Sequence, residues 1–197
     1  MAGIFRRLWG RASWLCLAAA ACGGSRPPGG GGGTAAPPGV RVLPLAEAIV
    51  LETAGSPPPD TTVTFIAGEP RIIVLRHGPP DYIVFAELSF PAPAFAERGR
   101  EVRVDVHPRP GVYGLEIAAS LPIRDSASVT FKYPRYFAAS ARARAIYGSD
   151  VAYERALSVG RVVPGGMLAL LPSTRPAPDL LQAPMPAPGA YLVAAPQ

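Results

Sequence analysis

The sequence predicts an all-β domain over residues 40–197, built as a sandwich or a barrel of about eight or nine strands. The first observation is a repeat of two along short runs, as where Val102, Val104 and Val106 alternate with polar residues. Side chains at positions i and i+2 lie on the same face of a strand, so each run has an apolar and a polar face. The second observation is that clusters of Pro and Gly separate the runs, which is typical of turns.

Eight runs follow this pattern. Their residue ranges are 62–65, 72–75, 82–90, 102–107, 113–117, 128–133, 167–171 and 191–195. Turn-forming clusters lie between them, for example at residues 78–81 and 108–111. Four residues in the middle of apolar faces are predicted to be core residues: Val104, Leu115, Phe131 and Tyr191. A helix is expected only over residues 45–52 and 140–146, and the second range fits a strand equally well.

Composition and charge restrict the class of protein. The 197 residues carry a formal net charge of +5, but Arg6, Arg7 and Arg11 supply three of those charges. The remaining chain has 16 basic and 14 acidic residues, a balance too even for a nucleic-acid partner, which needs a concentrated basic face. Both cysteines, Cys16 and Cys22, precede residue 25, which excludes disulfides and cysteine metal sites from the predicted domain.

Residues 1–21 are predicted to be a signal peptide. A basic zone is followed by about ten apolar residues, too few to span a bilayer, and then by small residues. The segment Ala19-Ala20-Ala21-Cys22 resembles the bacterial lipobox, in which small residues precede an invariant cysteine. The resemblance implies a lipoprotein in which Cys22 carries the lipid and becomes the mature N-terminus. The alternative is an ordinary cleaved signal peptide followed by an incidental cysteine.

Residues 22–39 are predicted to be a disordered tether rich in Gly and Pro. They contain consecutive glycines at positions 29–33 and proline pairs at 27–28 and 37–38. Such a segment buries no apolar surface, and a lipid anchor needs a spacer that lifts the domain off the membrane. A glycine-rich phosphate loop is excluded, because no strand precedes the glycines and no GK[ST] sequence ends the run.

A second resemblance covers about residues 100–195. Residues 112–115 have the sequence VYGL, residues 128–134 have SVTFKYP, and residues 189–194 have GAYLVA. These motifs resemble the ZU-type domains of netrin receptors, ankyrins and their bacterial surface relatives, although the tryptophan usual after the short strand at 146–147 is missing. The resemblance implies an immunoglobulin-like antiparallel β-sandwich that serves for contacts without catalysis. No contact residue of that family can be carried over to a position in this chain.

No catalytic or metal-binding constellation emerges from the sequence. His77 and His107 lie at the ends of predicted strands, and only Asp105 lies at ligand spacing from His107. The carboxylates are scattered, and the chain contains no G-x-S-x-G nucleophile motif. We therefore expect no catalytic residue, no metal site and no cofactor.

Basic and aromatic residues are densest between positions 132 and 144. A contact surface is expected there, with these members: Lys132, Arg135, Tyr136, Arg142 and Arg144. Such a patch can attract anionic headgroups or sugars, although ordinary solvated surface charges produce the same pattern.

Together these features predict a lipid-anchored protein of the bacterial envelope, on the periplasmic or surface side of the outer membrane, that presents a non-catalytic β-sandwich for structural or protein contacts. The expected partner, besides the membrane, is an envelope protein or a glycan. The alternative is a module that binds a carbohydrate or a peptide, and a hydrolase is the third interpretation. A binding module should carry a concave apolar pocket with convergent polar groups, whereas a purely structural domain should carry none.

Overall fold

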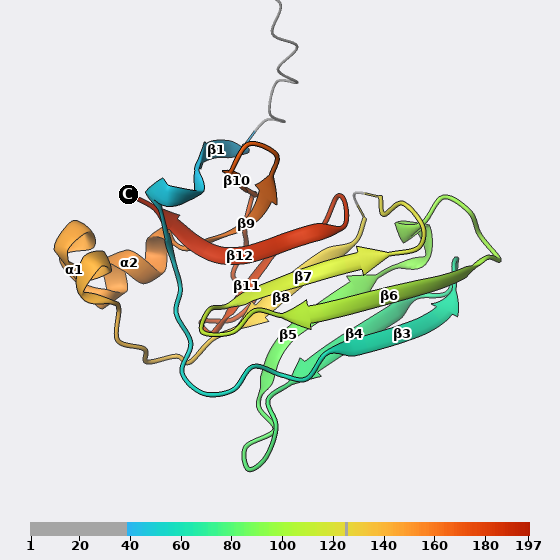
Figure 1. Cartoon of the computed structure of the whole chain (residues 1–197), viewed down its shortest axis with the longest axis horizontal. Coiled ribbons are helices and arrows are strands. Elements are labelled where there is room, and N and C mark those ends of the chain that lie inside the picture. Colours follow the sequence, from blue (N-terminus) through green and yellow to red (C-terminus); the bar gives the residue numbers. More distant parts are fainter. Residues whose placement is uncertain (1–38, 125) are drawn as a thin grey trace, which may run out of the picture. The chain divides into compact units, whose positions relative to one another are not determined.

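Two antiparallel β-sheets stack face to face in the computed structural model, which describes residues 39–124 and 126–197. Eight strands form one sheet and four form the other, and the two inner faces enclose the core (Figure 1). The predicted all-β antiparallel sandwich is therefore confirmed. The predicted signal peptide, Cys22 and all of the predicted tether except Gly39 lie outside the described residues.

The larger sheet has the strand order β1-β10-β9-β12-β7-β6-β3, and β2 pairs with β12 beside this path. Its strands are β1 (Arg41–Pro44), β2 (Ala48–Val50), β3 (Thr61–Ile66), β6 (Glu101–Pro108), β7 (Gly114–Ala119), β9 (Ser158–Val163), β10 (Met167–Leu170) and β12 (Gly189–Pro196). The first half of β12 pairs with β7, and its last three residues pair with β2. This C-terminal strand therefore connects β2, near the start of the described residues, to the middle of the sheet.

The smaller sheet has the order β11-β8-β5-β4. Its strands are β4 (Arg71–Arg76), β5 (Val84–Phe90), β8 (Ser128–Lys132) and β11 (Leu180–Pro184). Because all pairs are antiparallel, the end of β4, the start of β5, the end of β8 and the start of β11 meet at one end of the sandwich. The candidate site lies at this end.

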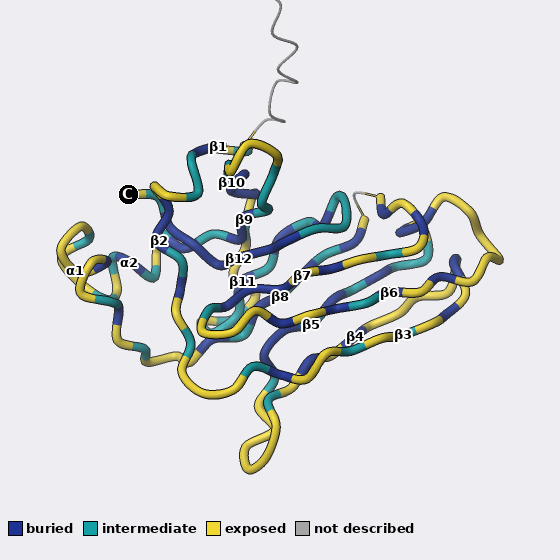
Figure 2. Tube along the Cα trace, in the orientation of Figure 1, coloured by how far each residue is buried: buried dark blue, intermediate teal, exposed yellow. Residues whose placement is uncertain are grey.

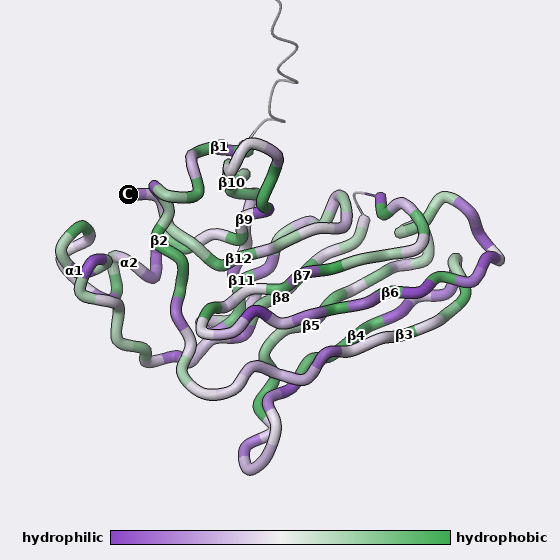
Figure 3. Tube along the Cα trace, viewed as in Figure 1, coloured by the Kyte–Doolittle hydropathy of each residue, from purple (hydrophilic) through white to green (hydrophobic). Residues whose placement is uncertain are grey.

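Alternation along the strands builds the core. Buried and exposed positions alternate visibly along β6 (Figure 2), and the buried positions are the hydrophobic ones (Figure 3). The predicted core residues Val104, Leu115, Phe131 and Tyr191 are all fully buried. Between the sheets, aromatic rings fill much of the space, with Phe65, Phe90 and Phe95 packed at ring-centroid distances of 5.5–5.8 Å.

Twelve strands are present in the described residues, more than the eight or nine expected. The additional strands are β1, β2, β9 and β11. Three of them show no clear alternation in the sequence. Strands β1 and β2 have only four and three residues, and β11 ends in Pro184. In β9, Gly160 occupies a position where a Cβ atom would lie 2.7 Å from Leu168, so the sheet needs a glycine where the pattern needs a large apolar residue.

The helix expected over residues 45–52 is wrong. A single 3-10 turn, Leu45–Glu47, is followed directly by strand β2. Residues 48–50 extend because β12 offers them backbone partners, with Ala194 opposite Val50. The same extension buries Ala48 beside Leu43, Leu168 and Leu192 in a second small apolar cluster. Pairing with β12 therefore overrode the local sequence pattern that had favoured a helix.

Residues 140–146, for which helix and strand were both open, form helix α1 (Ala141–Tyr147). The Ser140 side chain accepts a hydrogen bond from the amide of Ala143, and Gly148 ends the helix with a positive φ of 76°. A second helix that was not predicted, α2 (Asp150–Ala156), begins in the same way at Ser149. Within residues 39–124 and 126–197, no helix is long and apolar enough to cross a membrane.

Candidate ligand-binding cleft

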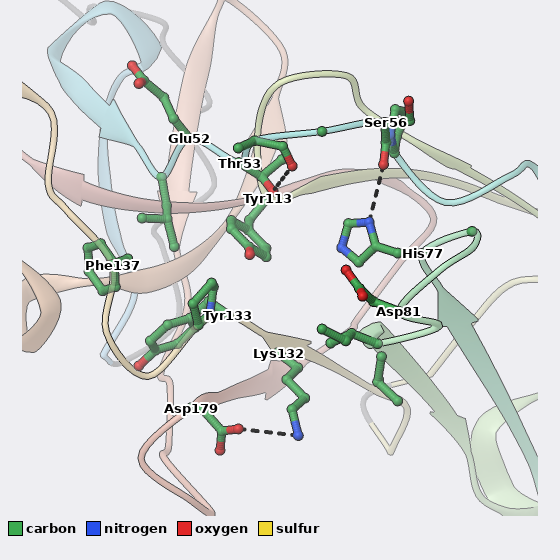
Figure 4. Close-up of a pocket in the computed structure, with 18 of the residues that line it drawn as sticks. Glu52, Thr53, Ser56, His77, Asp81, Tyr113, Lys132, Tyr133, Phe137 and Asp179 are labelled. Atoms are coloured by element: carbon green, nitrogen blue, oxygen red, sulfur yellow. Dashed lines mark hydrogen bonds and ion pairs between the residues drawn. The ribbon is translucent and has the colours of Figure 1, made fainter.

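A cleft of about 910 Å³ opens at the end of the sandwich where β4, β5 and β8 meet. Three separate segments supply most of its walls, namely residues 51–59, 77–84 and 132–138. Tyr113, just before β7, and Asp179, just before β11, complete the lining (Figure 4). The size lies within the range of about 300–1,000 Å³ that is usual for ligand pockets.

The floor of the cleft is a rigid aromatic stack. The rings of Tyr113 and Phe85 lie nearly parallel, with centroids 5.3 Å apart, and the ring of His77 meets Phe85 edge-on at 5.3 Å. Phe85 in turn contacts the core residue Phe131 edge-on at 6.1 Å. Burial raises the pKa of the Tyr113 hydroxyl, so it stays protonated at neutral pH. The floor is therefore continuous with the hydrophobic core and needs no ligand to keep its shape.

His77 has a defined orientation in the cleft. Its Nδ1 lies 3.2 Å from the backbone carbonyl oxygen of Ser56, and the line between them is drawn in Figure 4. A carbonyl oxygen only accepts, so Nδ1 carries the hydrogen of this bond. The other ring nitrogen is left for a ligand, as an acceptor when the imidazole is neutral.

Charged side chains of both signs lie along the cleft. The ammonium group of Lys132 lies 3.2 Å from the Asp179 carboxylate, and the two side chains are 39% and 29% exposed. Glu52 and Asp81 also line the cleft, and neither makes an ion pair within the described part of the chain. The cleft thus offers hydrogen-bond donors and acceptors close together, above an apolar floor.

The wall formed by residues 132–138 is anchored by two aromatic side chains. The Tyr133 hydroxyl donates to Glu154 and lies 3.2 Å from both the Glu154 carboxylate and the carbonyl of Pro178. Phe137 packs edge-on against Tyr133 at 5.8 Å and against Tyr153 at 6.1 Å. These contacts tie the wall to α2, although its residues 133–138 belong to no strand or helix.

The predicted contact surface is divided between two places. Lys132 and Arg135 line the cleft, and Tyr136 lies beside them with the Arg135 guanidinium 5.8 Å from its ring centre. Arg142 and Arg144 lie on α1 instead. Arg142 donates to the carbonyl of Ala46 at 3.3 Å, and Arg144 makes two hydrogen bonds of 2.8 and 3.0 Å to Asp150. The structure therefore does not bring these two guanidinium groups to the cleft.

The Arg144–Asp150 pair gives a testable pH dependence. Its hydrogen bonds lower the pKa of the Asp150 carboxylate, so the pair stabilises the fold above the ordinary carboxylate pKa. That contribution is lost as pH falls through the lowered pKa of the folded state. In Arg144→Ala, the pKa of Asp150 should rise towards its ordinary value, as measured by NMR titration of the side-chain carboxyl carbon. Arg142→Ala is the matched control, and an unchanged Asp150 titration in Arg144→Ala would contradict the assignment.

The two histidines have different surroundings. His77 lines the cleft, whereas His107 on β6 pairs with Asp60 at 2.9 Å. Asp105, the neighbour proposed for His107 from spacing, instead accepts hydrogen bonds from Arg103 and Thr62. Among residues 39–124 and 126–197, no group of three or more His, Cys, Asp or Glu side chains could hold a metal ion.

Several cleft residues were not singled out as site residues from the sequence. Tyr113 and Asp179 are the clearest cases, because they lie far apart in the chain and no sequence pattern connects them. The one local signal is the group of prolines that lines all three walls: Pro57, Pro59, Pro79 and Pro134. Proline-rich loops were assigned only as turns.

Comparisons of the chain with protein-family models, curated proteins and solved structures found no match. The lipobox and the ZU-type resemblance therefore remain predictions from their motifs. For the β-sandwich domain, the cleft is the feature on which a function can be argued.

Proposed function

We propose that this protein is a lipid-anchored component of the bacterial envelope whose β-sandwich binds a carbohydrate or peptide ligand in the cleft. The observation that carries the proposal is the cleft itself, in which side chains from three distant segments converge above an aromatic floor. A concave, mainly apolar pocket with a few placed polar groups is the usual form of a binding site. This observation favours binding over the purely structural role.

Binding is also favoured over hydrolysis by a hydroxyl or thiol nucleophile. Such a reaction needs a Ser, Thr or Cys side chain within hydrogen-bond reach of a base. His77 is the one histidine of the cleft, and the hydrogen bond described for it joins its ring to a backbone carbonyl of Ser56. In the part of the chain that the structure describes, no hydroxyl side chain is bonded to His77.

The proposed location depends on the N-terminal motif. A lipid on Cys22, followed by a Gly- and Pro-rich segment, would hold the domain at a membrane while leaving its cleft free to meet ligands in the envelope. The tether and the cleft then serve one role, the capture of a ligand near the membrane surface.

Filling the cleft should abolish binding. We would replace Ala54 and Ala138, exposed residues of opposite walls, in the variants Ala54→Trp and Ala138→Trp. The full chain in detergent would be screened against an oligosaccharide array and a random heptapeptide library. The indole occupies ligand volume, so each variant should bind any selected probe at least about tenfold more weakly, a loss of about 1.4 kcal/mol.

A matched control is Ala145→Trp, at an exposed position of α1 that does not line the cleft. It should bind as the wild type does. If the wild type selects no probe from either collection, or if the two cleft variants bind as well as the wild type, the cleft is not a binding site.

A further inference from the structure

The tyrosines of this protein are distributed unevenly between core and surface. All seven lie in the described residues, and only Tyr82 and Tyr136 are exposed, at 58% and 88%. Both flank the cleft on different walls. Tyr82 stands between the lining residues Asp81 and Ile83, and Tyr136 stands between Arg135 and Phe137. Neither ring lines the cleft itself, so two large rings stand exposed beside its walls, where a ligand longer than the cleft could reach them.

Tyr82 is held in an unusual backbone conformation. Its φ of 46° is the only positive value of a non-glycine residue in the described part of the chain. Such a conformation is costly for a bulky side chain and persists only where the surroundings enforce it. Here Arg76 donates to the Tyr82 carbonyl at 3.2 Å, and the amide of His77 donates to the carbonyl of Ile83 at 2.9 Å. The loop projects from the sandwich between β4 and β5 (Figure 2).

Tyr136 is positioned from both sides along the chain. The Arg135 guanidinium lies 5.8 Å from the centre of its ring, and the next residue, Phe137, is packed against Tyr133 and Tyr153. Phe137 therefore anchors the backbone next to Tyr136, while the Tyr136 ring itself is 88% exposed and available for a stacking contact.

Between the two rims, the polar groups suit an uncharged ligand rich in hydroxyl groups. Lys132 and Asp179 already balance each other's charge at 3.2 Å, and both remain partly exposed. With Arg135, Glu52 and Asp81 the lining has two basic and three acidic side chains, a formal balance of −1 that does not favour an anionic ligand. Asp81 supplies acceptor oxygens. His77 supplies its Nε2, because its Nδ1 is already bonded to the carbonyl oxygen of Ser56. A sugar hydroxyl both donates and accepts, so it can bond to each of these groups without bringing a charge of its own.

From these observations we propose that the ligand of the cleft is a neutral oligosaccharide, and that Tyr82 and Tyr136 bind it by stacking against its sugar rings. This inference rests on the proposed binding function and specifies its ligand. A peptide fits less well, because peptides commonly add a strand to an open sheet edge. Both long walls, at residues 53–57 and 133–138, are irregular segments without strands, and Gly55 breaks the first with a φ of 84°.

The test measures binding of neutral linear tetra- to hexasaccharides of glucose, mannose and N-acetylglucosamine to the full chain in detergent by isothermal titration calorimetry. We expect one of these series to bind. Tyr82→Ala and Tyr136→Ala should each weaken that binding by about 3- to 10-fold, as loss of an aromatic contact does. Tyr82→Phe and Tyr136→Phe keep the ring and should stay close to the wild type. Val151→Ala, at an exposed apolar position on α2, is the control for loss of surface area.

The outcomes separate this inference from the function on which it rests. Binding of random or proline-rich heptapeptides without any saccharide binding would keep the cleft as a binding site and overturn the saccharide. Saccharide binding that is unchanged in both alanine variants would overturn the role of the tyrosines. If neither saccharides nor peptides bind, the proposed function fails as well. Unchanged thermal unfolding of the alanine variants would show that a loss of binding is not a loss of fold.

Discussion

Phe131→Ala is expected to lower the free energy of unfolding by about 3–5 kcal/mol, as removal of a core phenylalanine does. Phe131 is fully buried in the middle of β8, with Ala86 of β5 and Leu181 of β11 as its neighbours in the sheet. Its ring supports Phe85, which carries the aromatic floor of the cleft. Small domains have only about 5–15 kcal/mol of stability in total, so this single change should remove a large part of it. Urea denaturation followed by far-UV circular dichroism measures the effect.

The neighbouring position provides the control for Phe131. Thr130 lies on the opposite face of β8 and is only partly buried, so Thr130→Ala should cost less than about 1 kcal/mol. A loss in Phe131→Ala as small as that of Thr130→Ala would mean that the register of β8 is wrong. Phe131→Leu should fall between the two, because it retains most of the buried volume.

Cys22→Ser is expected to abolish lipid attachment completely. The proposed lipid is joined through the sulfur of Cys22, and serine offers no thiol for that bond. Wild-type protein expressed in bacteria with radiolabelled palmitate should carry the label and sediment with membranes. A single acyl chain binds membranes only marginally, whereas two or more hold a protein firmly, so loss of the modification should release the domain from the membrane fraction.

Cys16→Ser is the matched control for the anchor, because Cys16 lies inside the predicted signal peptide and should be removed with it. This variant should be labelled like the wild type. Equal labelling of Cys22→Ser and the wild type would exclude Cys22 as the lipid attachment site. A wild type without any label would support the alternative of an ordinary cleaved signal peptide.

The core and most strands followed from the sequence because alternation is a local property. In β6 and β8 the apolar residues occur at every second position, so the face that holds Val104 or Phe131 can be identified without knowing what packs against it. For residues 140–146 the sequence left helix and strand open, although the capping residues Ser140 and Gly148 lie directly beside the helix α1 that forms there.

Only the tertiary structure decided the features that depend on contacts between residues far apart in the sequence. Residues 48–50 became strand β2 instead of a helix because β12 pairs with them. Arg144 was expected on one contact surface with Lys132 and Arg135, and the structure instead places it on α1, where its guanidinium bonds to Asp150. The cleft is the strongest example, since His77, Tyr113 and Lys132 meet only because β4 and β8 end, and β7 begins, at the same side of the sandwich. Sequence determines which face of a strand is apolar, whereas strand pairing determines which side chains become neighbours.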